Sequence, residues 1–167
     1  MNREAQRRAL CCELVVDVAR STGEVCLKVT GVSMLPAIWP GDVVTIRRCD
    51  LAGLLPGQIV MYGREGKLTA HRVMLVSHDH LVARGDSLSC CDPPVRAFEI
   101  VGQVTSISRA GRSISPEQSF WQRAASSILR RSDFCTRLAL ALNRRLRRSG
   151  DMQASWRNSS PLPARKW

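Results

Sequence analysis

Residues 58–77 read QIVMYGREGKLTAHRVMLVS, and this stretch decides the fold. Its first part, 58–62, is short and aliphatic, as expected of a strand. A polar segment at 63–67 contains two glycines, which can take the positive φ angles that a hairpin turn needs. A second apolar run follows at 68–77 and carries His71. The pattern predicts two antiparallel strands joined by a tight turn.

Further segments around this hairpin also have the composition of strands. They lie at 24–30, 42–48, 80–84 and 99–109. No helical periodicity separates them, so parallel pairing through helical crossovers is excluded. We expect a mainly β fold, built as an antiparallel sheet or a small β-barrel.

Helices are expected at the two ends of the chain. Residues 3–20 predict a helix, because apolar positions recur at three- and four-residue spacing, at Ala9, Cys12, Val16 and Ala19. After Gly111 the composition changes again and predicts basic helices. The expected organisation is an N-terminal helix in 1–23, a β domain in 24–110, a basic helical appendage in 111–150 and a disordered tail in 151–167.

The basic charge is concentrated at the C-terminal end. Residues 1–110 carry 13 Lys and Arg against 11 Asp and Glu, whereas residues 111–167 carry 12 against 3. We expect the basic segment either to contact an anionic membrane surface peripherally or to pack its leucines onto the β domain. Nucleic acid is not an expected partner, because aromatic residues make up only 5% of the chain and no reading motif is present.

Composition excludes several classes of protein. Apolar residues make up 44% of the chain, which is enough for a packed core. No uncharged apolar run approaches the roughly 20 residues that span a bilayer. Glu13 and Asp17 interrupt the N-terminal apolar region, so no signal peptide is predicted. We therefore expect a cytoplasmic protein without a transmembrane helix, and the sequence leaves its oligomeric state open.

The seven cysteines are expected to be reduced and buried, because their number is odd and no export signal is predicted. The neighbours Cys90 and Cys91 lack the C-x-x-C spacing of zinc ligands. His78 and His80 have no second ligand pair at the spacing of a zinc site. We expect neither a metal ion nor another cofactor.

Three short segments contain the side chains of an activated hydroxyl nucleophile. Ser33 lies in a turn-rich stretch, His71 lies on a predicted strand, and Asp86 and Asp92 follow the strand at 80–84. A serine hydroxyl is a weak nucleophile near neutral pH and needs a base within hydrogen-bond reach. That base benefits in turn from an orienting acid. Each residue also has an ordinary structural explanation, as a turn cap, a core histidine or a turn aspartate.

The motifs around these residues, taken in order, resemble the signal peptidase I family and its relatives, the self-cleaving domains of SOS-type repressors. GVSMLP at 31–36, followed by GDVV at 41–44, is similar to the family's nucleophile box. GQIVMY at 57–62 is similar to the strand that follows this box, with glutamine in place of aspartate at position 58. The resemblance covers residues 25–108.

Two later motifs are similar to the endoplasmic-reticulum and archaeal branch of the family. HRV at 71–73 places a histidine where the bacterial enzymes and the repressors have a lysine base. RGDS at 84–87 keeps the branch's Gly-Asp, and position 92 keeps its second acid, but both asparagines of the branch are missing.

The resemblance implies a role for each of four residues. Ser33 would be the nucleophile and His71 the general base, which later protonates the leaving amine. Asp92 would orient His71, while Asp86 would support the loop. The reverse assignment of the two acids stays open.

Two neighbours of Ser33 would support it. Met34 resembles the residue that lines the substrate cleft, and Gly31 stands where many signal peptidases add a second oxyanion donor. Signal peptidases are normally tethered by transmembrane helices, and the repressors carry an upstream DNA-binding module. Because neither is predicted in this sequence, it resembles a stand-alone catalytic domain without a membrane anchor. The resemblance implies a serine endopeptidase that acts on a peptide or protein precursor. Two alternatives stay open: an autoproteolytic domain, and a non-catalytic binding module that recruits an anionic partner through its basic C-terminus.

Overall fold

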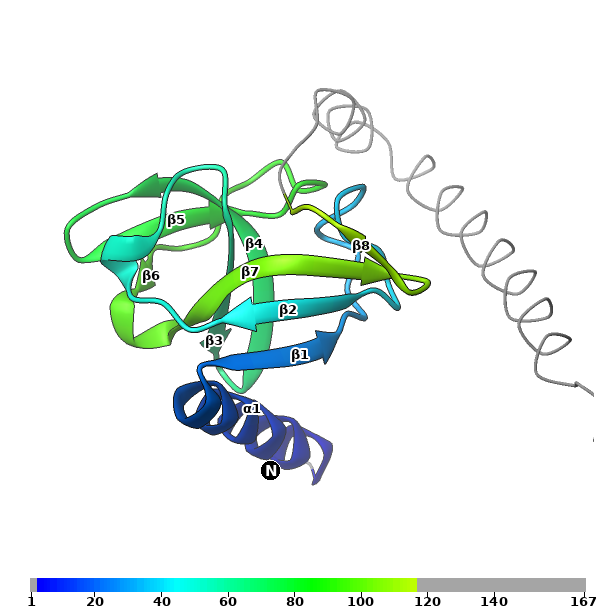
Figure 1. The fold of residues 1–167 in the computed structure, drawn as a ribbon. Coiled ribbons are helices and arrows are strands. Elements are labelled where there is room, and N and C mark those ends of the chain that lie inside the picture. Colours follow the sequence, from blue (N-terminus) through cyan, green and yellow to red (C-terminus); the bar gives the residue numbers. More distant parts are fainter. Residues whose placement is uncertain (1–2, 117–167) are drawn as a thin grey trace, which may run out of the picture. The chain divides into compact units, whose positions relative to one another are not determined.

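The computed structural model describes residues 3–116 (Figure 1). A helix, α1 (Arg3–Thr22), is followed by β1 (Glu24–Lys28), β2 (Val43–Arg47), β3 (Ile59–Arg64), β4 (Lys67–Val76), β5 (His80–Arg84), β6 (Val95–Arg96), β7 (Ile100–Arg109) and β8 (Arg112–Ile114). Two short 3-10 turns, η1 (Leu51–Gly53) and η2 (Ala97–Glu99), precede β3 and β7. This confirms a mainly β fold with an N-terminal helix. The predicted helices after residue 116 and the tail at 151–167 lie outside the described residues.

Helix α1 packs one face onto the sheet and ends at a glycine. Ala19 is buried and Val16 packs beside it, as their spacing predicts. Gly23, with φ +77°, follows the helix, and its amide donates a 3.0 Å hydrogen bond to the Ala19 carbonyl. This left-handed residue turns the chain directly into β1. Neither α1 nor another helix within residues 3–116 is long and apolar enough to cross a membrane.

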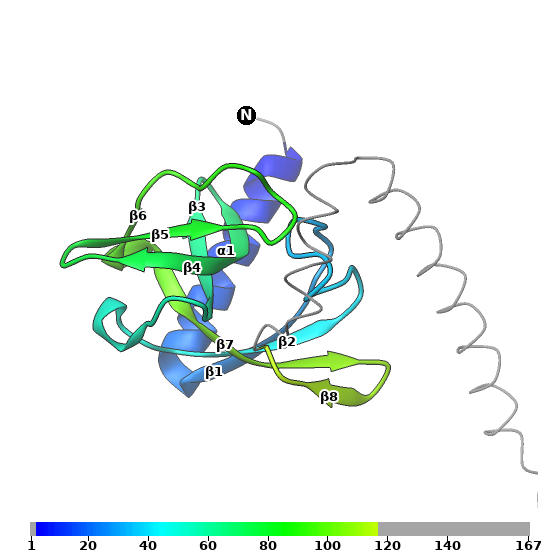
Figure 2. The ribbon, with the colours of Figure 1, turned by 90° about the horizontal axis from the view of Figure 1, so that it is seen from above.

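The sheet is antiparallel throughout and open. Its strand order is β1-β2-β7-β3-β4-β5-β6, with β8 paired to β7 (Figure 2). Within residues 3–116 no pairing joins β1 to β6, so the predicted alternative of a closed barrel is wrong. Pro93 and Pro94 lack amide hydrogens and precede β6, which is only two residues long. Such a short strand offers little edge on which further pairing could close the sheet.

The two faces of the sheet cover two apolar clusters, which we call the first and second clusters. Strand β3 is buried on both faces and divides its side chains between them with a period of two. The first cluster contains Ala19, Met34, Ala37, Ile38, Val44, Ile46, Ile59, Met61, Val101, Val104 and Ile107. The second contains Leu51, Leu54, Val60, Tyr62, Val73, Leu81, Ala83 and Val95.

Strand β7 connects the two halves of the sheet. Its beginning pairs with β3 and its later part pairs with β2, with a register shift in each ladder. Gly102 lies where β7 passes between these neighbours, and a Cβ at this position would overlap the backbone carbonyl of Arg47. The absence of a side chain at Gly102 therefore allows β2 and β7 to come together.

The sequence pattern missed the two shortest strands, β6 and β8. Two or three residues are too few to show the alternation that marks a strand. Because β8 pairs with β7, the sheet continues past the predicted domain boundary at residue 110 and into the segment expected to be helical.

The prediction that the cysteines are buried is also wrong for those that the structure describes. The six that the structure describes are free thiols, but Cys11, Cys26, Cys90 and Cys91 are exposed, and Cys12 and Cys49 are half-buried. Cysteine is among the most frequently buried residue types, yet composition alone does not assign a residue to a face of a helix or loop.

Gly102→Ala tests the close approach of β2 and β7. The added methyl group must displace the Arg47 backbone, so we expect the free energy of unfolding to fall by at least about 1–3 kcal/mol, as for overpacking of a core. Gly53→Ala is the matched control, because a Cβ there meets nothing within 4 Å. Urea unfolding measures both variants. Equal stabilities for the two would contradict the close contact.

Candidate active site

Ser33 lies in the loop that joins β1 to β2, which we call the β1–β2 loop (residues 29–42). Met34, Leu35 and Ile38 follow Ser33 and are all buried. The Ile38 amide donates a hydrogen bond to the Met34 carbonyl at 2.9 Å, which closes a turn. Ser33 itself is half-buried, and the buried residues that follow it fix the position of its backbone.

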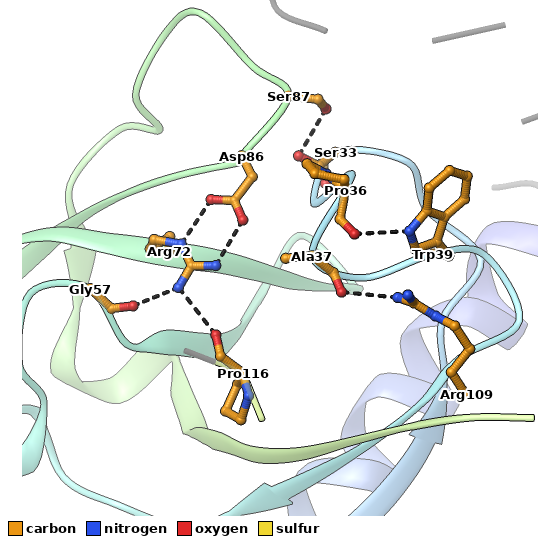
Figure 3. A network of polar contacts seen from close by, with 10 residues as sticks. All are labelled: Ser33, Pro36, Ala37, Trp39, Gly57, Arg72, Asp86, Ser87, Arg109 and Pro116. Atoms are coloured by element: carbon orange, nitrogen blue, oxygen red, sulfur yellow. Dashed lines mark hydrogen bonds and ion pairs between the residues drawn. The ribbon is translucent and has the colours of Figure 1, made fainter. Parts of the chain in front are cut away.

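A buried carboxylate closes the β1–β2 loop. Asp42 is fully buried, accepts a 2.8 Å hydrogen bond from the Trp39 amide and lies 2.8 Å from Nη2 of Arg109. The same guanidinium donates to the Ala37 carbonyl at 3.1 Å (Figure 3). The Trp39 indole donates to the Pro36 carbonyl at 2.8 Å (Figure 3). Arg109 of β7 thus holds the β1–β2 loop at two points, the backbone carbonyl of Ala37 and the carboxylate of Asp42.

The structure brings Ser33, His71 and Asp92 together, although they are far apart in the sequence. Nε2 of His71 lies 2.9 Å from Oγ of Ser33, and Nδ1 lies 2.6 Å from Oδ2 of Asp92. His71 is 5% exposed, and the Asp92 side chain is 16% exposed. With the proton on Nδ1 donated to the carboxylate, Nε2 can accept the serine proton. This is the geometry of a nucleophile, a base and an orienting acid.

The two acids, of which the resemblance favoured Asp92 as the partner of His71 and left the reverse assignment open, occupy different places. Asp86 pairs with Arg72, whose Nε and Nη2 each donate a 2.8 Å hydrogen bond to its carboxylate (Figure 3). Both residues are 5% exposed. Asp92 is the acid that contacts His71, and its amide is fixed by a 2.8 Å hydrogen bond to the Ala83 carbonyl.

The segment after β5 also holds the backbone of Ser33. The Ser33 carbonyl accepts hydrogen bonds from the amide and the hydroxyl of Ser87, both at 2.9 Å (Figure 3). A Cβ at Gly85 would lie 2.7 Å from this same carbonyl, so the close approach requires glycine. Ser87 was not among the predicted site residues, because its contact depends on the chain returning to Ser33 after β5.

The two residues expected to support Ser33 differ in their surroundings. Met34 is 4% exposed and belongs to the first cluster, so its side chain packs in the core. Gly31 is exposed and has open space around the position of a Cβ. Lacking a side chain, Gly31 supplies no hydroxyl donor near Ser33.

Tyr62 lies beside the three residues and was not among the predicted site residues. Its ring centroid is 6.3 Å from that of His71, with the planes at 71°, which is an edge-on contact. Burial raises the pKa of the Tyr62 phenol above its ordinary value, and the negative charge of Asp92 and a hydrogen bond to it raise this pKa further. Val60 is the strand partner of His71, and Tyr62 lies two residues after Val60, on the same face of β3. Sequence alone could suggest Tyr62 only if this register were known.

The described residues contain no metal cluster. Within residues 3–116 no three His, Cys, Asp or Glu side chains gather as ligands. His80 instead lies 2.7 Å from Asp79 in an exposed pair on the β4–β5 turn.

The chain matches no model of a protein family and no curated protein sequence.

Asp86→Ala tests whether the pair with Arg72 is structural. The change leaves a buried guanidinium without its carboxylate, and breaking one side of a buried pair costs about 3–5 kcal/mol. We expect the free energy of unfolding to fall by this amount in urea. Glu24→Ala is the control, because it removes an exposed pair with Arg47 that contributes less than about 1 kcal/mol. Similar losses for the two variants would refute a structural role for Asp86.

Proposed function

We propose that this chain is a serine endopeptidase of the signal-peptidase type, acting on a peptide or protein precursor. The observation that carries the proposal is the continuous hydrogen-bonded series from Ser33 through His71 to Asp92. The motif resemblance assigns the same three residues to the same roles. A pair of contacts with this order and these distances is what the chemistry of acyl transfer requires.

In the proposed mechanism, Oγ of Ser33 attacks the carbonyl carbon of the scissile peptide bond. His71 takes the serine proton at Nε2 and gives it to the leaving amine nitrogen as the C–N bond breaks. The acyl-enzyme ester is then hydrolysed by water, with His71 again accepting and returning a proton. Asp92 accepts the Nδ1 proton in a hydrogen bond throughout, so it holds the ring orientation and stabilises the imidazolium.

The Ser33 amide can stabilise the oxyanion. Within residues 3–116 it donates no hydrogen bond, so its N–H is available to the negative oxygen of a tetrahedral intermediate. The Val32 carbonyl belongs to the same peptide unit as this N–H. It accepts a 3.2 Å hydrogen bond from the Leu35 amide and lies 3.1 Å from Oγ of Ser87, so this peptide unit is already oriented before substrate binds. Such preorganisation avoids a cost of reorientation during the reaction.

The surroundings of Ser33 favour an extended chain as substrate. Strand β3 pairs with the first part of β4, from Lys67 to Arg72, whereas β5 pairs only with its later part, from Arg72 onward. The second edge of Lys67–His71 therefore has no strand partner in the described part of the chain, and this edge leads directly to the base. An extended peptide can bind to such an edge through main-chain hydrogen bonds.

A hollow of about 560 Å³ lies elsewhere, beside β3 and β7, and Ser33, His71 and Asp92 do not line it. A reactive serine outside such a hollow is accessible to an extended polypeptide.

We also propose a cytoplasmic location for the protein. The basic segment 111–167 would contact anionic lipid peripherally, because it carries 12 Lys and Arg against 3 Asp and Glu.

Ser33→Ala tests the nucleophile. A fluorophosphonate probe should label the wild-type protein at Ser33, and the variant should show neither labelling nor peptide cleavage. Loss of one hydroxyl changes stability by only about 1 kcal/mol, so the variant should still fold. Ser89→Ala removes an exposed serine in the segment between β5 and β6 and serves as control. Peptide mass mapping of the labelled protein decides the matter, and a label on any other serine would disprove the assignment.

Asp92→Asn tests the orienting acid. An asparagine cannot hold the imidazole in the required tautomer, so we expect kcat to fall about 10³- to 10⁴-fold, as in related triads, with KM little changed. Cleavage of peptides selected from a library provides both constants. Asp79→Asn is a matched control, since Asp79 also contacts a histidine but lies on the surface. Equal activities for the two variants would remove Asp92 from the mechanism.

A further inference from the structure

Two tight turns of the chain meet at the candidate nucleophile. The first, which we call the nucleophile turn (residues 32–35), is closed by a 3.2 Å hydrogen bond from the Leu35 amide to the Val32 carbonyl. The second, which we call the facing turn (residues 85–88), follows β5 and is closed by a 3.0 Å hydrogen bond from its last amide to its first carbonyl. Ser87 lies in the facing turn, and its hydroxyl contacts the nucleophile turn.

The facing turn is held in place without the hydroxyl of Ser87. The carboxylate of Asp86 is bound by Arg72, and both residues are buried. The Ser87 amide donates a 2.9 Å hydrogen bond to the Ser33 carbonyl. A Cβ at Gly85 would lie 2.7 Å from the same carbonyl, so the backbones of the two turns are in close contact. Removal of the hydroxyl therefore leaves the contact between the turns in place.

The hydroxyl of Ser87 lies within hydrogen-bond distance of two successive carbonyls. Its Oγ is 2.9 Å from the Ser33 carbonyl (Figure 3) and 3.1 Å from the Val32 carbonyl. A hydroxyl has one hydrogen, so these two carbonyls share a single donor. Each of them also has a backbone donor, the Leu35 amide for Val32 and the Ser87 amide for Ser33. The hydroxyl is thus an additional donor that can favour either carbonyl.

The Val32 carbonyl and the Ser33 N–H belong to one trans peptide group. They point in opposite directions, so Ser87 lies on the carbonyl side and the oxyanion would form on the N–H side. Hydrogen bonds at the two ends of one peptide group polarise each other. When the N–H donates to the negative oxygen, the Val32 carbonyl becomes a better acceptor and attracts the hydroxyl hydrogen of Ser87 more strongly.

We propose that Ser87 is a positioning residue that strengthens the oxyanion donor, because its hydroxyl binds the carbonyl end of the peptide group whose other end is the Ser33 N–H. This inference rests on the proposed function. The hydrogen bond strengthens as the oxyanion forms, so it stabilises the transition state more than the ground state. Since Gly31 supplies no hydroxyl donor, the rate depends more strongly on this one amide.

Ser87→Ala removes the hydroxyl and keeps the amide contact. The first readout is the rate at which a fluorophosphonate labels Ser33, because the phosphoryl oxygen gains negative charge as the serine adds. We expect this rate to fall about three- to tenfold, as for the loss of one hydrogen bond in the transition state. Thermal unfolding confirms that the variant is folded.

The second readout is an NMR signal that does not depend on activity. In protein labelled with ¹³C-carbonyl valine and ¹⁵N-serine, only the pairs Val32–Ser33 and Val76–Ser77 give a correlation between a carbonyl and the next amide. Ser33→Ala removes the first signal and so identifies it. We expect Ser87→Ala to shift the Val32 carbonyl signal and to leave that of Val76 unchanged, because only the first carbonyl loses a donor.

Two further variants separate the hydroxyl from the fold around it. Ser87→Thr keeps a hydroxyl and should restore the labelling rate and the Val32 signal. Ser89→Ala is the control, because it removes an exposed hydroxyl that lies 3.8 Å from Sγ of Cys90, and it should leave both readouts at their wild-type values.

A Ser87→Ala protein that is labelled at the wild-type rate would overturn the inference, and so would a reduced rate that threonine does not restore. Failure of the wild-type protein to be labelled would instead refute the proposed function. In that case the Val32 carbonyl signal would still test the contact with Ser87.

Discussion

The buried ion pair between Arg72 and Asp86 sets the geometry on which the rest of the site depends. Arg72 follows His71 on β4, and Asp86 precedes Ser87, which holds the Ser33 carbonyl. The remaining nitrogen of the guanidinium donates to the Gly57 carbonyl at 2.6 Å and to the Pro116 carbonyl at 3.4 Å (Figure 3). One side chain therefore joins β4, the start of β3, the segment after β5 and the segment after β8. The distance between His71 and Ser33 depends on these attachments.

Asp86 and Asp92 differ in burial and in the residue that each one contacts. Asp86 is enclosed and makes two parallel hydrogen bonds to a permanent cation, which suits a structural pair. Asp92 is partly exposed and faces a histidine that can gain and lose a proton. Six positions separate them in the sequence, and the segment between them turns back so that they reach neighbouring residues of β4. Two carboxylates of the same type thus differ in role because of the partner that each one meets.

Much of this arrangement could be predicted from the sequence. The hairpin around His71 and the helix at 3–20 follow from long stretches with a clear period, and their observed ends lie within one or two residues of those expected. The motif resemblance favoured Asp92 over Asp86 as the acid that orients His71, but it left the reverse open, since the choice depends on which acid meets Arg72. The contact of Tyr62 also escaped prediction, because it depends on register across two strands. Local pattern defines elements, whereas these contacts arise only when the elements pair.

The two apolar clusters have a consequence for the cooperativity of the molecule. Ser33 is followed by Met34, which belongs to the first cluster, whereas His71 is followed two residues later by Val73, which belongs to the second. Ser33 and His71 are thus each attached to a residue of a different cluster. Local opening of a protein takes less free energy than global unfolding. A local fluctuation that moves one cluster relative to the other would also separate Oγ of Ser33 from Nε2 of His71, so the contact between these atoms depends on the packing of both clusters.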